Sequence, residues 1–101
     1  MAPILEDQKG VQHACEVETS MMMVVAPETV KHERLGEAFG MLNGDPRKAY
    51  PASRYLPFKD NLTTSGVIGD ARRANKQKGE KLLAVCAEGL AATLKNREMW
   101  A

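Results

Sequence analysis

Apolar residues recur with helical spacing in two parts of the chain, one near each end. Between positions 13 and 26 there is no glycine or proline, and Pro27 follows, so this stretch predicts a helix. Its four β-branched residues lower the helix propensity, whereas alanine, glutamate and three methionines raise it, and the length exceeds that of a typical strand. The apolar residues that share one helical face, as in a buried helix, are Ala14, Val17, Met21, Val24 and Val25.

The second stretch, from Arg73 to about Arg97, predicts a long amphipathic helix. Gly79 and Gly89 each cost this helix about 1 kcal/mol relative to alanine, so we expect one of them to pack closely against a neighbour. The apolar positions that recur with helical period are Leu82, Leu83, Val85, Cys86, Leu90, Ala91 and Leu94.

The region between the two helices is less regular. Residues 28–42 hint at a short amphipathic helix interrupted by Gly36 and Gly40, and residues 43–46 predict a turn. Residues 47–66 predict extended or irregular structure, and residues 66–70 a tight apolar turn before the last helix. Helices around irregular loops are unusual for a self-contained domain, so we expect part of an α/β layered structure whose sheet comes largely from elsewhere.

Composition narrows the classes of function. The 101 residues include 14 basic and 13 acidic ones, and this balance argues against nucleic-acid or anionic-membrane partners. No apolar run approaches the roughly 18 residues of a membrane span, and no secretory signal is recognisable. Cys15 and Cys86 are too few for a disulfide framework, so we expect reduced core thiols in a cytoplasmic protein. The methionines at 21–23 are expected to fill the core, and the basic residues at 72–81 to form a solvated face.

The richest group of candidate chemical residues lies at positions 13–20. If a helix begins near Gln12, His13 and Glu16 share a face and could bind one divalent ion, or one could ligate while the other transfers protons. The helix N-terminus would favour Glu16 and Glu18 as anions. A first-turn capping or surface pair is the alternative, and spacing does not decide, because metal sites need three or more protein ligands.

Two blocks of sequence resemble the creatininase family. Residues 12–23 resemble its signature His-Ala-Gly-Glu-x-Glu-Thr-Ser and the apolar helix after it, and residues 27–30 match Pro-Glu-x-Val. Residues 65–70 match Ser-Gly-Val-x-Gly-Asp, and residues 74–80 match the Ala-x-x-x-Lys-Gly that precedes a final helix. One departure is Cys15, where the family has glycine, so the backbone freedom of glycine is lost there.

The resemblance implies an α/β fold of sheet flanked by helices, of which residues 1–101 form a single partial domain, the C-terminal part, mostly helical within this chain. It also implies oligomers, often hexamers, and a site that holds zinc or manganese. Matched to the signature, His13 would be the proton-transferring catalytic residue and Glu16 a metal ligand. Glu18 would support the helix or hold a metal ligand in place.

The implied reaction is hydrolysis of a C–N bond in a cyclic amide or a related small molecule. The family's other metal motifs, Glu-x-His, a following aspartate and Asn-Gly-His, do not occur in this sequence. We therefore expect a missing N-terminal half or a partner subunit to complete the metal site. The alternative is a non-catalytic assembly module derived from the family. A third reading, a helix near residues 72–81 that contacts nucleic acid, has only its charge in favour.

Overall fold

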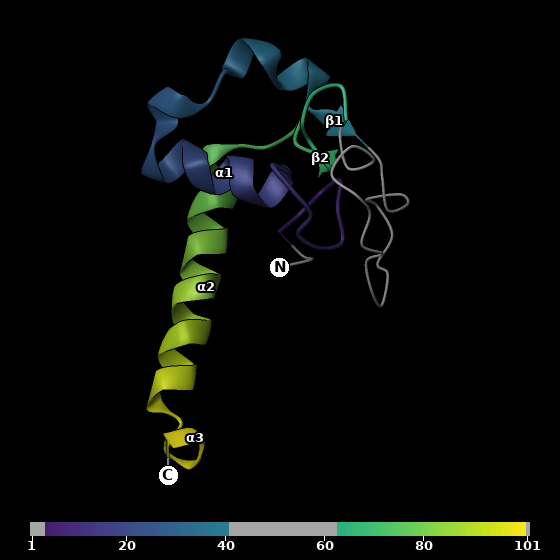
Figure 1. Cartoon of the computed structure of the whole chain (residues 1–101). Coiled ribbons are helices and arrows are strands. Elements are labelled where there is room, and N and C mark those ends of the chain that lie inside the picture. The colour runs from purple at the N-terminus through teal and green to yellow at the C-terminus, as the bar shows by residue number, and fades with distance from the viewer. Residues whose placement is uncertain (1–3, 41–62, 101) are drawn as a thin grey trace.

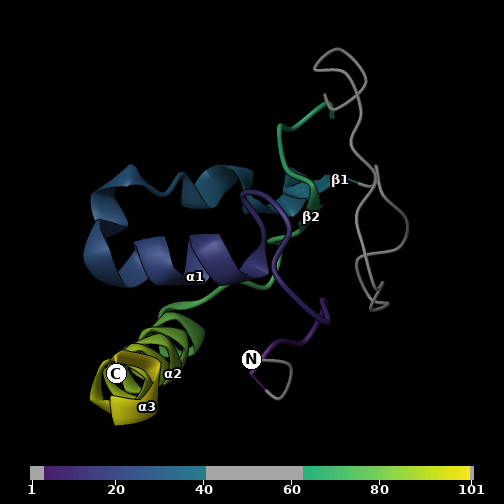
Figure 2. The ribbon, with the colours of Figure 1, turned by 60° about the horizontal axis from the view of Figure 1, so that its bottom comes forward.

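The computed structural model describes residues 4–40 and 63–100, which are mostly helical and include one two-stranded antiparallel sheet. In Figure 1, α1 crosses one end of α2, and the rest of α2 extends away from this crossing to α3 at its far end. Figure 2 looks nearly along α2 and shows the sheet beside the opening segment of the chain. The elements in order are α1 (Glu16–Val25), η1 (Pro27–Thr29), η2 (His32–Glu37), β1 (Phe39–Gly40), β2 (Gly69–Asp70), α2 (Lys76–Lys95) and α3 (Arg97–Trp100).

Helix α1 ends just before Pro27 as predicted, but it begins at Glu16 rather than near Gln12. The delay arises because His13 pairs with Ile68 in an isolated β-bridge, with both backbone N–H···O distances at 2.9 Å. Ala14 then takes a positive φ of 48°, which a right-handed α-helix does not accommodate. The expectation that His13 and Glu16 share a helical face was therefore wrong.

The core forms where α1 meets α2 and the opening segment. Leu5, Cys15, Val17 and Leu82 make one buried cluster. The predicted close packing at a glycine is confirmed for Gly79, because a Cβ there would lie 1.9 Å from the carbonyl oxygen of Ser20. A Cβ on Gly89 would meet nothing within 4 Å.

The faces of both helices differ in part from their predictions. On α1, Val17 and Met23 are buried, whereas Val25 is exposed and Met22 is 40% exposed. On α2, Leu82 is fully buried, but the apolar positions beyond it are open to solvent: Val85, Cys86, Leu90 and Leu94. The expectation of a core thiol thus holds for Cys15 and fails for Cys86.

Helix α2 starts at a side-chain cap. Asn75 accepts a hydrogen bond from the backbone N–H of Lys78 at 2.9 Å, which satisfies one of the free donors of the first turn. The helix runs to Lys95, two residues short of the predicted end, and α3 follows directly. None of the described helices is long and apolar enough to cross a membrane.

The segment after α1 forms two 3₁₀ turns and the short strand β1 instead of the amphipathic helix predicted for residues 28–42. Strand β1 pairs with β2 in the register Phe39–Asp70 and Gly40–Gly69, so the predicted glycine-bounded turn at 66–70 contains a strand. The turn predicted at 43–46 and most of the extended segment predicted at 47–66 lie outside the described residues.

Candidate functional site

His13 lies at the start of the signature, and its surroundings fix its backbone. Its N–H and C=O are both bound to Ile68, and the residue itself is exposed. The next residue, Ala14, has the left-handed φ of 48°, a conformation that costs a residue with a Cβ roughly 1–2 kcal/mol. The Glu18 carboxylate accepts a hydrogen bond from the Ala14 N–H and stabilises this turn. These contacts hold the backbone of His13 at one place on the surface.

The cysteine that replaces the family's glycine does not strain this turn. Cys15 has an extended backbone with φ −96°, which any residue can adopt. The left-handed residue is Ala14, one position earlier. The loss of glycine at position 15 is therefore accommodated, and the Cys15 side chain lies in the core.

Glu16 is fully buried, and both of its carboxylate oxygens are already hydrogen-bonded. They accept from the backbone N–H of Glu6 at 3.0 and 3.2 Å and from that of Asp7 at 3.2 Å. Oε2 also accepts from Nζ of Lys78 at 2.8 Å. The carboxylate thus faces α2 and the opening segment. These contacts do not favour the metal-ligand role expected for Glu16, which stays a prediction.

Lys78 is the cation of this buried group, so the expectation that it belongs to a solvated face was wrong. Its Nζ also binds the Glu6 carboxylate and the backbone oxygen of Arg73, the latter at 2.7 Å. Burial lowers the pKa of Lys78, but the hydrogen bonds to Glu16 and Glu6 outweigh burial and raise that pKa above its ordinary value. The hydrogen bond from Lys78 also lowers the pKa of the Glu6 carboxyl. The ammonium group is therefore stabilised in its charged form.

Gln8 is a buried residue that the sequence pattern did not single out. Its Oε1 accepts from the backbone N–H of Glu16 at 3.1 Å and from that of Asp70 at 2.8 Å, and its Nε2 donates to the Gly10 oxygen at 2.8 Å. One amide thus ties together the start of α1, strand β2 and the loop that leads to His13. A lone glutamine in an irregular segment gives no periodic signal that could have revealed this role.

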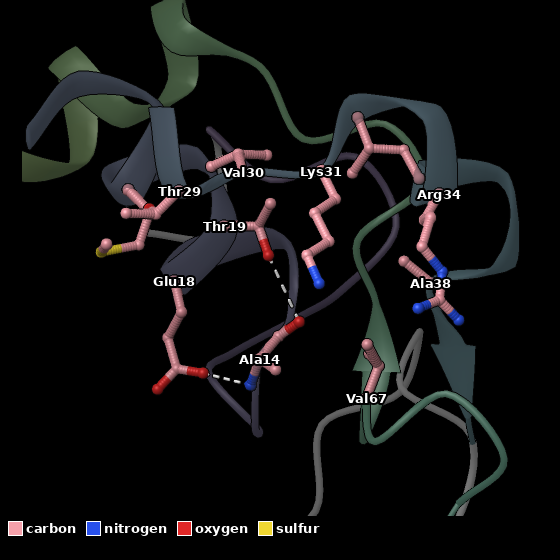
Figure 3. A pocket seen from close by; sticks show the side chains of 11 residues that line it. Ala14, Glu18, Thr19, Thr29, Val30, Lys31, Arg34, Ala38 and Val67 are labelled. Atoms are coloured by element: carbon pink, nitrogen blue, oxygen red, sulfur yellow. Dashed lines mark hydrogen bonds between the residues drawn. The ribbon is translucent and has the colours of Figure 1, made fainter. Parts of the chain in front are cut away.

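A cavity of about 420 Å³ opens beside the turn that carries His13. Ala14, Glu18 and Thr19 contribute to one side, residues 29–38 to another, and Val67 closes it near the sheet (Figure 3). His13 itself does not line this cavity, although its neighbour Ala14 does.

The described residues do not make a metal site by themselves. Nowhere in residues 4–40 and 63–100 do three histidine, cysteine, aspartate or glutamate side chains come together in a group that could hold an ion. His13 and Glu18 lie at the turn, while Glu16 is bound to Lys78. A structural zinc ion needs four ligands and a catalytic one about three, so the described residues supply too few to hold an ion on their own.

The sequence block around this turn matches a known family. A family model described as creatininase, creatinine amidohydrolase, matches residues 2–94. The chain belongs to the creatininase family. A creatinine amidohydrolase from Pseudomonas putida is 27% identical over 86 residues, which make up 84% of this chain and 30% of that protein. The chain thus spans about 30% of the length of this curated relative. No solved structure matches.

Proposed function

We propose that this chain is a component of a metal-dependent amidohydrolase that cleaves a C–N bond in a cyclic amide or a related small molecule. The family match over residues 2–94, which includes the signature around His13, is the observation that carries this proposal. In fold terms, residues 1–101 would be one partial domain, the C-terminal part of a layered sheet flanked by helices. The described two-stranded sheet would then be a corner of that larger sheet.

His13 would act in proton transfer. His13 is exposed, and Ile68 and Glu18 fix the backbone of its turn, so the imidazole is accessible to a substrate and projects from a fixed point. An imidazole so placed can take a proton from an attacking water and deliver it to the leaving nitrogen of the amide. The Glu18 carboxylate would serve this role indirectly, because it stabilises the turn after His13.

The remaining ligands of the metal would lie outside the described residues, on another part of the polypeptide or on a partner subunit. Zinc or manganese, when bound, would polarise the amide carbonyl and acidify a water. For Glu16 to join that ligand set, Lys78 and two backbone donors would have to release it. The contacts support a simpler role for Glu16, the buried anchor of α1 on α2.

The exposed apolar residues of α2 support a partner. Val85, Leu90 and Leu94 are 42%, 62% and 58% exposed on the part of the helix that extends away from the crossing with α1 (Figure 1). Leu90 and Leu94 are four residues apart and share one face of the helix, whereas Val85 lies on another face. Exposed apolar side chains that share a face mark an interaction site. An N-terminal half, or other subunits of an oligomer, would cover them. The same surface is the observation in favour of the alternative, a non-catalytic assembly module.

Co-expression with an N-terminal half of a creatininase-family member tests the proposal. We expect the two chains to elute together from a sizing column and to hydrolyse creatinine or another cyclic amide when zinc or manganese is supplied. His13→Ala should lower turnover about 100-fold or more, the usual contribution of an acid–base residue, with the melting temperature unchanged. His32→Ala, which changes an exposed histidine of η2, is the matched control and should leave turnover intact.

Separate elution of the two chains would refute completion by a partner half. A soluble complex that turns over no amide would favour the assembly module. Comparable losses of turnover and of stability in His13→Ala would identify a structural histidine instead of a catalytic one.

A further inference from the structure

The cavity beside the His13 turn has the dimensions of a small-molecule site. Its volume of about 420 Å³ falls within the roughly 300–1,000 Å³ typical of ligand pockets. Most of its wall is apolar, as such pockets usually are. The apolar residues that line it are Ala14, Met22, Val30, Leu35, Ala38 and Val67.

Two cations line the same side of this cavity. Lys31 and Arg34 are three residues apart across the first turn of η2, where the Arg34 N–H donates to the Lys31 oxygen at 2.9 Å. Lys31 directly precedes η2 as its N-cap residue, Arg34 lies in the first turn of η2, and both residues line the cavity. Figure 3 shows the Lys31 side chain extending into the space bounded by Thr19, Ala14 and Val67, with Arg34 beyond it.

Neither cation is firmly paired within the part of the chain that the structure describes. Lys31 makes no ion pair there, and Arg34 has one contact, from its Nε to the Glu37 carboxylate at 3.4 Å. Both side chains of that pair are more than 60% exposed, and such pairs contribute little. Within the described residues, no strong partner therefore competes with a ligand for either positive charge.

Among the described residues of the wall, the one acidic side chain lies on the other side. Glu18 projects from α1, and its carboxylate is bound to the Ala14 N–H (Figure 3). A negative group in the cavity would be repelled from Glu18 and attracted to Lys31 and Arg34. An N–H group of the same ligand would be attracted to Glu18. The charges of the wall therefore define the orientation of a bound ligand.

We propose that this cavity binds a small organic carboxylate, with the carboxylate on Lys31 and Arg34 and an apolar or amide-bearing body toward Glu18. Arginine suits this task because its planar guanidinium can donate two parallel hydrogen bonds to a carboxylate. Together with the proposed amidohydrolase function, on which this step rests, the inference specifies the substrate class as an amide that carries a carboxylate.

Two ring compounds that differ in one group test the inference. 5-Oxoproline is a five-membered cyclic amide with a carboxylate, and 2-pyrrolidinone is the same ring without it. Titration of the ¹⁵N-labelled 101-residue chain with each, followed by NMR without added metal or partner, gives two dissociation constants. We expect the dissociation constant of 5-oxoproline to be about tenfold lower, with the largest shifts at Ala14, Val30 and Val67.

Variants assign the preference to the two cations. Lys31→Met and Arg34→Met should each reduce the preference about threefold, and the double variant should abolish it. Lys95→Met removes an exposed lysine in the last turn of α2 and should change nothing. The preference should also shrink in 0.5 M salt, because these charges are solvent-accessible.

Equal affinities for the two ring compounds, or an equal loss in Lys95→Met, would overturn the inference. Its failure is distinguishable from failure of the proposed function, because binding is measured without turnover. An inactive complex with an intact carboxylate preference would refute only the hydrolase, and an active complex without the preference would refute only the carboxylate site.

Discussion

The buried contact between Lys78 and Glu16 gives the sharpest prediction of stability. Lys78→Met keeps the aliphatic stem but removes the ammonium group, so the fully buried Glu16 carboxylate is left with backbone donors alone. The carbonyl oxygen of Arg73 loses its donor as well. Removing one partner of a buried ion pair costs about 3–5 kcal/mol. Since a domain is stable by roughly 5–15 kcal/mol in total, this variant should be close to unfolding.

Urea denaturation followed by far-ultraviolet circular dichroism measures the effect. With a slope of about 1.5 kcal/mol per molar urea, the midpoint should fall by about 2–3 M. Lys81→Met changes an exposed lysine of the same helix and should shift stability by less than about 0.5 kcal/mol. Adding Glu16→Gln to Lys78→Met removes the unpaired charge and should restore part of the loss. A loss below about 1 kcal/mol in Lys78→Met, the value for an exposed pair, would refute this reasoning.

The same contact sets a dependence on alkaline pH. The folded-state pKa of Lys78 is raised above its ordinary value of 10.5, so its contribution to stability is complete below pH 10.5. That contribution is lost as pH rises through the higher folded-state pKa. The free energy of unfolding of the native chain should therefore fall more steeply above pH 10.5 than that of Lys78→Met.

Two further predictions concern the helix crossing and the sheet. Gly79→Ala should destabilise the chain by about 2 kcal/mol or more, because the added Cβ would overlap the Ser20 carbonyl oxygen. Gly89→Ala, whose Cβ would meet nothing, should stabilise the chain by about 0.5–1 kcal/mol. Thermal denaturation separates these outcomes, and equal shifts of the two melting temperatures would contradict the close helix crossing at Gly79. The hydrogen bonds from Arg72 lower the pKa of Asp70 below its ordinary value of 3.8. The Asp70 carboxylate therefore contributes its full stability above pH 3.8, and this contribution is lost as the pH falls through the lowered folded-state pKa. Asp70→Asn should lower the free energy of unfolding by about 1 kcal/mol at pH 7 and by less at pH 2. Urea denaturation of both proteins at a series of acidic pH values measures this difference, and an equal loss at pH 2 would contradict the role of the Asp70 charge.

Local patterns in the sequence were sufficient to predict α1, α2 and one contact between them, but not the 3₁₀ helices that follow α1. The absence of glycine and proline before Pro27 predicts α1, and the apolar period predicts α2. Gly79 stands inside a strong helix where alanine would be better, so it signals a neighbour, and Ser20 is that neighbour. The two sequence blocks that resemble the creatininase family identified the family correctly, because fixed residues in fixed order do not depend on knowing the fold.

Contacts between distant residues could not be predicted in the same way. A lysine among other lysines and arginines looks solvated, yet Lys78 is buried because Glu16, 62 positions earlier, meets it across the helix crossing. His13 was expected within a helix, but its backbone pairs with that of Ile68, and the helix begins only at Glu16. Gln8 binds three separate segments, and only the folded arrangement brings those partners together.

The first turn of α1 shows how the family signature can combine stability and chemistry in adjacent residues. Successive helical residues are separated by about 100°, so Glu16 and Glu18 differ by about 200° and point to opposite sides of the helix. One carboxylate is buried against Lys78, and the other supports the exposed turn at Ala14 beside the cavity. In this arrangement the two glutamates cannot ligate the same ion. An assay of activity alone would score Glu16→Gln as the loss of a metal ligand, because unfolding also abolishes turnover. Measured unfolding free energy beside turnover separates the two, and a stable but metal-free Glu16→Gln variant would restore Glu16 to the ligand set.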